Sequence, residues 1–204
     1  MKDDCAIIVF AKDPVPGHAK TRLIPALGAE GAARLALRML RETLSSAVAA
    51  GAGPVELCCT PDQTSAVVRD EAARHGLGLT AQGEGDLGER MCRALARQLA
   101  VHPRAIVIGT DCPTLHPQVL RHAARLLRTK QAVFAPASDG GYVLVGLAAP
   151  LPALFQDIPW STGAVMARTR ERIARLGIAA AELPLMHDVD EAQDLVHVPT
   201  GWLG

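Results

Sequence analysis

The feature that most constrains this chain is a regular alternation of short apolar runs with longer amphipathic stretches. Most of the runs are continuously apolar, as expected for parallel strands that are covered on both faces. They lie at Cys5–Ala11, Val55–Thr60, Leu77–Ala81, Ala105–Gly109, Ala132–Pro136, Tyr142–Leu147 and Ile178–Leu183. Strands separated by helices in this rhythm predict an α/β fold, a Rossmann-like three-layer sandwich around a mostly parallel central sheet.

The stretches between those runs have helical periodicity. The longest extends from about Glu30 to Ala50, and its apolar positions recur every three or four residues beside a parallel polar stripe. Further helices are predicted at Gln63–His75, Gly88–Val101, Pro117–Arg128 and Gly163–Leu176. Thr162 is placed to cap the last of these, and Pro117 suits a first helical position. Because no composition break indicates a linker, we expect residues 1–204 to form a single domain.

The charge balance excludes some classes of function. Lys and Arg together number 21, as do Asp and Glu, so the formal net charge is zero. A dedicated nucleic-acid binder carries a basic excess because it neutralises phosphates, so we expect no nucleic acid as partner. Aromatic residues make up 3% of the chain, which also disfavours a stacking platform for single strands.

Cysteine usage and the apolar runs suggest the compartment. The five cysteines are an odd number and contain no CxxC pair, which disfavours a zinc site or a disulfide framework. The N-terminal apolar run is too short and its flank too acidic for a signal peptide. No run reaches the roughly 18 apolar residues that a membrane helix needs. We therefore expect a cytoplasmic protein with reduced thiols and no membrane insertion.

A basic loop follows the first predicted strand. In folds of this class, ligands bind beyond the carboxyl ends of the strands. Lys12, Lys20 and Arg22 lie within eleven residues there, and two prolines and Gly17 stiffen the chain between them. Rigid backbone and nearby cations suit a diphosphate, although a solvated surface turn is the alternative. The loop is neither a P-loop nor a GxGxxG turn.

Carboxylates stand at two further strand or helix ends. Asp111 follows the apolar run ending at Gly109, where it could ligate a divalent cation that bridges phosphate oxygens or could cap a helix. Asp188 and Asp190 precede a predicted helix near the C-terminus. Acidic residues there either complement the helix dipole or supply a second metal ligand.

Two glycine-rich turns complete the candidate site. Asp139 is followed by two glycines, which indicates either a hairpin turn or a tight turn that lets the backbone approach a substrate, with Asp139 facing the site. Gln82 and Gly85 belong to a polar entry into a helix. Gln82 could hydrogen-bond a base edge, while Asp86 would also serve as a helix cap.

Five ordered segments resemble one known family. They are Phe10–Leu23, Gly85–Met91, Gly109–Pro113, Ser138–Tyr142 and Pro159–Thr162. They look like the motifs of the bacterial DUF2064 family, also called rSAM/selenodomain-associated glycosyltransferases, in the nucleotide-diphospho-sugar transferase superfamily. The resemblance implies a GT-A-type fold.

The same resemblance bears on the metal ligands and on the donor. The superfamily's metal-binding aspartate matches Asp111. The pattern Val189-Asp190 through Asp194-Leu195 is similar to one in cytidylyltransferases and implies Asp190 as second ligand. The opening loop carries proline where nucleotidyltransferases carry glycine, which favours a diphosphate over a triphosphate.

Together these observations favour a metal-dependent glycosyltransferase that uses a nucleotide-diphospho-sugar and an unidentified small-molecule acceptor. Mg²⁺ or Mn²⁺ on Asp111 and Asp190 would offset the charge on the leaving nucleotide, and Asp139 would act at the acceptor. The donor would be bound by Lys12, Gly17, Lys20, Arg22, Gln82 and Gly85. Two alternatives stay open: a nucleotidyltransferase acting on a small phosphorylated metabolite, and a catalytically silent nucleotide-binding module.

Overall fold

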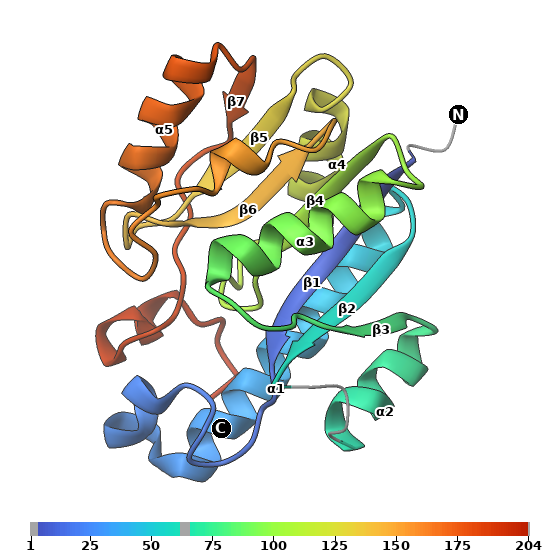
Figure 1. Ribbon diagram of the computed structural model, residues 1–204. Coiled ribbons are helices and arrows are strands. Elements are labelled where there is room, and N and C mark those ends of the chain that lie inside the picture. Colours follow the sequence, from blue (N-terminus) through green and yellow to red (C-terminus); the bar gives the residue numbers. More distant parts are fainter. Residues whose placement is uncertain (1–3, 62–65, 204) are drawn as a thin grey trace.

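The central sheet carries most of the predicted strands at nearly the expected positions. The computed structural model describes residues 4–61 and 66–203. In this part of the chain, seven strands pair in the order β3-β2-β1-β4-β6-β5-β7 (Figure 1). They are β1 (Cys5–Lys12), β2 (Val55–Thr60), β3 (Gly78–Ala81), β4 (Arg104–Ile108), β5 (Ala132–Pro136), β6 (Tyr142–Leu147) and β7 (Ala180–Glu182). Of these, β6 runs antiparallel to its neighbours β4 and β5, and the other pairings are parallel.

Helices cover both faces of the sheet. They are α1 (Ile24–Ala50), α2 (Ala66–His75), α3 (Leu87–Leu99), α4 (Pro117–Leu126) and α5 (Val165–Leu176). Buried side chains of α1, α2 and α4 share one cluster with the sheet, whereas those of α3 and α5 share another. The three-layer α/β prediction is therefore confirmed (Figure 1). The predicted start of the second helix, at residues 63–65, lies outside the described residues.

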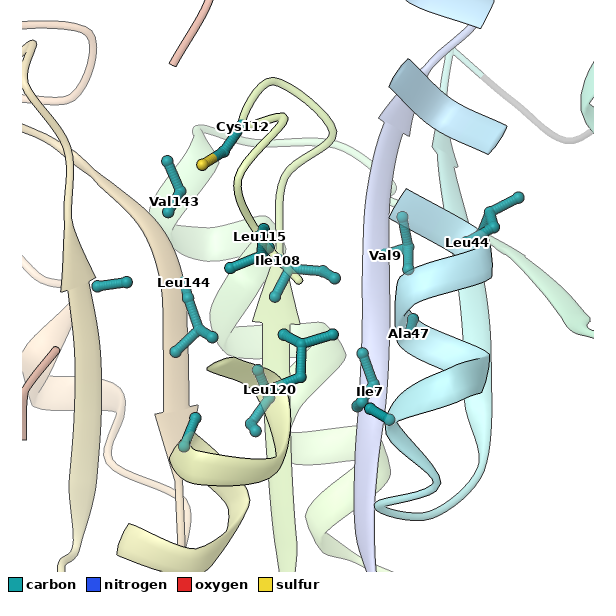
Figure 2. Packing of buried hydrophobic residues seen from close by; sticks show 14 of the residues in the cluster. Ile7, Val9, Leu44, Ala47, Ile108, Cys112, Leu115, Leu120, Val143 and Leu144 are labelled. Carbon is teal, nitrogen blue, oxygen red and sulfur yellow. The ribbon is translucent and has the colours of Figure 1, made fainter. Parts of the chain in front are cut away.

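Strand β1 shows why its sequence is continuously apolar. Ile7 and Val9 contribute to the cluster that contains Leu44 and Ala47 of α1 (Figure 2). The intervening residues, such as Ile8, belong to the cluster on the α3 face. Because successive side chains of a strand point to opposite faces, a strand between two helical layers needs apolar residues at every position. Burying each large side chain stabilises the fold by about 1.5–3 kcal/mol.

A third cluster joins the C-terminal segment to the start of α1. Leu35 and Met39 of α1 are buried with Val189, and Trp202 packs against them. The helix assigned to α1 is interrupted at Gly28, where φ is 69° and ψ is 165°, so its regular part begins close to the predicted Glu30. This packing brings the acidic residues around Val189 beside the loop that follows β1.

The helix caps agree with the sequence in one case and not in another. Asp86 caps α3 in a reciprocal capping box with Glu89, so the predicted cap is confirmed. The prediction that Thr162 caps the last helix is wrong, because the N-cap position is Ala164. The Thr162 hydroxyl instead accepts a hydrogen bond from the Ala164 backbone N–H at 3.3 Å, two residues before the N-cap position of α5.

The cysteine thiols are mostly buried, and burial raises the pKa of one of them strongly. All five cysteines are reduced thiols, and four of them are buried. Burial, with a smaller contribution from Cys58, raises the pKa of the Cys59 thiol to about 12, so this group is uncharged at neutral pH. Throughout residues 4–61 and 66–203, no helix combines the length and the apolar character needed to cross a bilayer.

Candidate active site

A cavity of about 720 Å³ lies at the carboxyl ends of β1 and β4 and at the start of β6. The loops after parallel strands converge at this edge of the sheet, and β6, which runs the other way, begins there. Seven of the predicted site residues line the cavity: Lys12, Lys20, Arg22, Gln82, Asp111, Asp139 and Asp190. Gly17 and Gly85 are not among the described residues that line it.

Lys20 forms the centre of the site. Its ammonium nitrogen lies 2.5 Å from Oδ1 of Asp111 and 2.8 Å from Oδ1 of Asp190. It also donates a hydrogen bond to the backbone carbonyl of Val189 at 2.6 Å. An ammonium group has three donors, and these three acceptors match that number. The Lys20 side chain is only 8% exposed, so the contacts are largely shielded from water.

The charges around Lys20 are coupled. Burial alone lowers the pKa of Lys20, but the carboxylates of Asp111 and Asp190 raise it, and the net effect is a raised pKa. Lys20 is therefore fully charged at neutral pH. One ammonium offsets only part of the charge of two carboxylates, so the pair attracts a further cation less strongly than it would without Lys20.

The two carboxylates come from segments that are held together by the backbone. The Val189 N–H donates to the backbone carbonyl of Asp111 at 2.8 Å. The Asp194 carboxylate accepts hydrogen bonds from the backbone N–H groups of Asp190 and Glu191, at 3.0 and 2.7 Å, at the start of a 3₁₀ helix. Asp194 and Glu191 thus take the capping role at this helix, which leaves the Asp190 carboxylate to Lys20.

The backbone of Lys20 is also unusual. Its φ of 47° and ψ of 45° place it in the left-handed region, directly before the 3₁₀ turn Thr21–Leu23. A residue with a Cβ atom pays roughly 1–2 kcal/mol in this conformation. Buried Ala19 and Leu23 on either side hold the turn in place. Non-glycine residues in strained conformations cluster at functional sites, which agrees with the position of Lys20 in the cavity wall.

Asp139 lies in the turn of the β5–β6 hairpin, so the hairpin interpretation is confirmed. Its carboxylate accepts a hydrogen bond from the Gly141 N–H at 2.7 Å. The space beside Gly140 is already filled by protein. Gly140 has a φ of 87°, and a Cβ built on it would overlap the backbone oxygen of Gly163. The glycine therefore allows two loops of the site to pack together, and does not make room for a substrate.

Asp188 is a buried acid close to Asp139. Its carboxylate accepts a hydrogen bond from the Ser138 hydroxyl at 3.3 Å. Burial, followed by the negative charge of Asp139, raises the pKa of Asp188 above its ordinary value. Both acids line the same cavity as Lys20. The cavity therefore has carboxylates on the side of the hairpin as well as around Lys20.

An aromatic wall was not predicted from the sequence. Tyr142 and Trp160 line the cavity and pack edge to face, with ring centroids 6.3 Å apart. The Trp160 ring lies so close to the start of α3 that a Cβ on Gly88 would overlap it. A usable signal existed, because Tyr142 is the only tyrosine of a chain with few aromatic residues, and both rings lie in segments with family resemblance.

Two other predicted residues, Gln82 and Arg22, differ in their burial and in their hydrogen-bond partners. Gln82 is buried, and its amide nitrogen lies 3.2 Å from the backbone carbonyls of both Ala11 and Cys58. The amide N–H groups of Gln82 thus donate hydrogen bonds to the ends of β1 and β2. Its amide oxygen can still accept a hydrogen bond from a ligand. Arg22 is 71% exposed at the cavity edge, with a guanidinium nitrogen 3.7 Å from Oε1 of Glu191.

The carboxylate pair can be tested against the divalent ion that the fold family implies. Among the described residues, no group of three or more His, Cys, Asp or Glu side chains is arranged to hold a metal. Asp111 and Asp190 nevertheless converge on one cation, the Lys20 ammonium. Mg²⁺ is usually held by one or two protein carboxylates together with substrate phosphates. The pair therefore fits Mg²⁺ or Mn²⁺ that takes its other ligands from a nucleotide.

Comparison with known proteins identifies the family. The sequence model of DUF2064, described as an uncharacterized protein conserved in bacteria, matches residues 43–162. The chain belongs to the DUF2064 family. This DUF2064 protein is also 30% identical, over 192 residues, to a 3-phospho-D-glycerate guanylyltransferase of Phenylobacterium zucineum (strain HLK1). The match covers 91% of this chain and 86% of the relative. The resemblance seen in the ordered motifs is thereby confirmed.

Solved structures agree on the GT-A-like fold. A protein of Desulfovibrio desulfuricans G20, assigned to the nucleotide-diphospho-sugar transferases, is 28% identical and superimposes with a TM-score of 0.88, over 98% of this chain and 90% of that one. Glucosyl-3-phosphoglycerate synthase of Mycobacterium tuberculosis, in complex with Mn²⁺, uridine diphosphate and glucosyl-3-phosphoglycerate, is 13% identical with a TM-score of 0.58. That match covers 94% of this chain and 74% of the other, and concerns the fold alone.

Proposed function

We propose that this DUF2064 transferase moves a nucleotidyl group from a nucleoside triphosphate to a small phosphorylated acid and releases pyrophosphate. The observation that carries the proposal is the meeting of a cationic loop with the Asp111–Asp190 pair in one cavity. The guanylyltransferase relative favours this reaction over the nucleotide-diphospho-sugar donor that the loop prolines favoured. Its name also suggests guanosine triphosphate and 3-phospho-D-glycerate as the first substrates to try.

Each group of residues has a distinct role in this reaction. Lys12, Lys20 and Arg22 bind the phosphates of the donor by charge-assisted hydrogen bonds. Asp111 and Asp190 would hold Mg²⁺ or Mn²⁺, which when bound supplies positive charge that offsets the charge on the leaving pyrophosphate. The exposed Arg22 at the cavity edge can follow the outermost phosphate.

The acceptor side needs little chemistry from the protein. A phosphate oxygen of the acceptor attacks the α-phosphorus, a new P–O bond forms, and the bond from the α-phosphorus to pyrophosphate breaks. Because the attacking oxygen is already anionic, no general base is required. The protein's contribution is then to orient both substrates and to stabilise charge, which the rigid loops at the strand ends can provide.

Glycosyl transfer is the second candidate, and two observations favour it. One is the close structural match to the Desulfovibrio desulfuricans protein. The other is the pair of carboxylates on the hairpin side, Asp139 and Asp188, which could orient an acceptor hydroxyl or take its proton. In that reaction the sugar moves to the acceptor, and a nucleoside diphosphate is released.

A ligand panel separates the two candidates. A ligand that binds the folded protein at 100 times its dissociation constant stabilises it by about 2.7 kcal/mol, so melting temperatures rank the ligands. We expect guanosine triphosphate with Mn²⁺ to give a larger shift than guanosine diphosphate sugars or other nucleotides. The Arg22→Ala variant should show a smaller shift with the triphosphate and an unchanged shift with guanosine.

The opposite ranking would contradict the proposal. A larger shift with a nucleotide-diphospho-sugar than with the matching triphosphate would favour glycosyl transfer. If the shifts of Arg22→Ala fell equally for guanosine and for the triphosphate, the basic loop would not be binding phosphate.

A further inference from the structure

We propose that the Lys20 ammonium occupies the metal site of the free enzyme by binding both Asp111 and Asp190. A divalent ion replaces it there only when a nucleotide phosphate binds the ammonium. The inference rests on the proposed function, because it assumes that the carboxylate pair binds the metal. In addition, Lys20 would make the nucleotide bind before the divalent ion.

The contacts of Lys20 show that its ammonium and a metal ion would use the same atoms. Oδ1 of Asp111 and Oδ1 of Asp190 both lie within hydrogen-bond distance of Nζ, at 2.5 and 2.8 Å. A divalent ion bound to these oxygens would come within a few ångströms of a second positive charge. Two cations at such a separation repel each other strongly in a site shielded from water, so they compete for the pair.

The side chain of Lys20 is able to leave the pair without moving the backbone. Its flexible four-carbon stem is compatible with more than one position of the ammonium, whereas buried Ala19 and Leu23 hold the main chain. Lys20 also lines the cavity in which the donor phosphates would lie. A phosphate oxygen can therefore replace each carboxylate as an acceptor, and the ammonium keeps its charged partners in both positions.

Two features distinguish the contacts of Lys20 with Asp111 and Asp190 from an ordinary surface ion pair. Lys20 has a side chain only 8% exposed, whereas most ion pairs of the described structure involve well-exposed cations. Its backbone is also left-handed, with φ of 47°, a costly conformation of the kind that clusters at functional sites.

The consequence is cooperative binding. In the free enzyme the pair is already neutralised in part, so a divalent ion should bind weakly. Once the nucleotide accepts the ammonium, both carboxylates become available and the ion should bind tightly. By linkage, the metal must then strengthen nucleotide binding by the same factor.

The test is a titration of the protein with Mn²⁺ in the absence of nucleotide. Electron paramagnetic resonance measures the concentration of free Mn²⁺ at each step. Wild-type protein should bind Mn²⁺ weakly. The Lys20→Met variant, whose unbranched side chain is one atom shorter and carries no charge, should bind Mn²⁺ at least about tenfold more tightly. Adding Asp111→Asn to that variant should remove the gain. The matched control is Lys12→Met, which removes a cation from the same loop and should leave Mn²⁺ affinity close to wild type.

The outcomes are decisive in both directions. If Lys20→Met binds Mn²⁺ no better than wild type, or if Lys12→Met gains as much, the proposal is wrong. Should Lys20→Met fail to fold, Lys20→Gln keeps hydrogen-bond donors without the charge and must show the same gain. Because no nucleotide is present, a tighter Mn²⁺ site would stand even if the enzyme transferred no nucleotidyl group, and active transfer without that gain would overturn only this inference.

Discussion

Replacement of Asp111 by Asn should reduce the turnover of the enzyme by about 10²–10³-fold, the loss that follows removal of one group that stabilises transition-state charge. Asn keeps the size of the side chain but lacks the charge that a hard cation needs. The Asp111 side chain is 46% exposed, and Lys20 retains Asp190 and the Val189 carbonyl as partners, so the melting temperature should change by only a few degrees. Initial rates and thermal melts measure the two effects.

Asp86→Asn is the matched control for this change. Asp86 is an exposed cap of α3, and Asn caps a helix about as well as Asp. The same loss of one carboxylate should therefore leave turnover near wild type. If Asp111→Asn kept its full rate and its metal-dependent nucleotide affinity, Asp111 would not be part of the metal site.

Gly140→Ala should lower the free energy of unfolding by about 2–4 kcal/mol, in the range of substitutions that introduce backbone strain together with a steric overlap. Gly140 has a φ of 87°, and the added Cβ would overlap the backbone oxygen of Gly163. The hydrogen bond from the Met166 N–H to the Gly140 carbonyl, at 2.8 Å, ties the same two segments together. Urea unfolding measures this loss.

The Gly177→Ala variant separates the cost of backbone strain from the cost of steric overlap. Gly177 also has a left-handed conformation, with a φ of 65°, but a Cβ there would meet no atom within 4 Å. Its substitution should cost only the conformational part, about 1 kcal/mol. Equal losses in the two variants would mean that the contact between the hairpin turn and the loop at Gly163 contributes nothing to stability.

The sheet could be predicted from the sequence because its physical requirement is local. Central strands such as β1 are buried on both faces, so they appear as continuous apolar runs with clear ends. The two edge strands were predicted too long: β3 begins at Gly78 and not Leu77, and β7 spans only Ala180–Glu182. A strand with a partner on one side only has fewer hydrogen bonds to define its ends.

The proposed metal site could be predicted only in part. Asp111 was identified because it follows a buried strand, a signal within a few residues. That Asp111 and Asp190 share Lys20 as a partner depends on the cluster in which Val189 packs against α1, and Lys20 and Asp190 are 170 residues apart. No local pattern encodes such packing. For the same reason the sequence did not predict that Lys20 contacts both Asp111 and Asp190.

Phosphorus-31 magnetic resonance of a reaction mixture shows whether the protein transfers a nucleotidyl group. The mixture contains the enzyme, Mg²⁺, guanosine triphosphate and 3-phospho-D-glycerate, with Asp111→Asn as the inactive control. We expect pyrophosphate to accumulate together with an equal amount of a new compound in which two phosphates are joined through one oxygen. If no triphosphate yields pyrophosphate, while a nucleotide-diphospho-sugar is consumed with release of its nucleoside diphosphate, nucleotidyl transfer is contradicted.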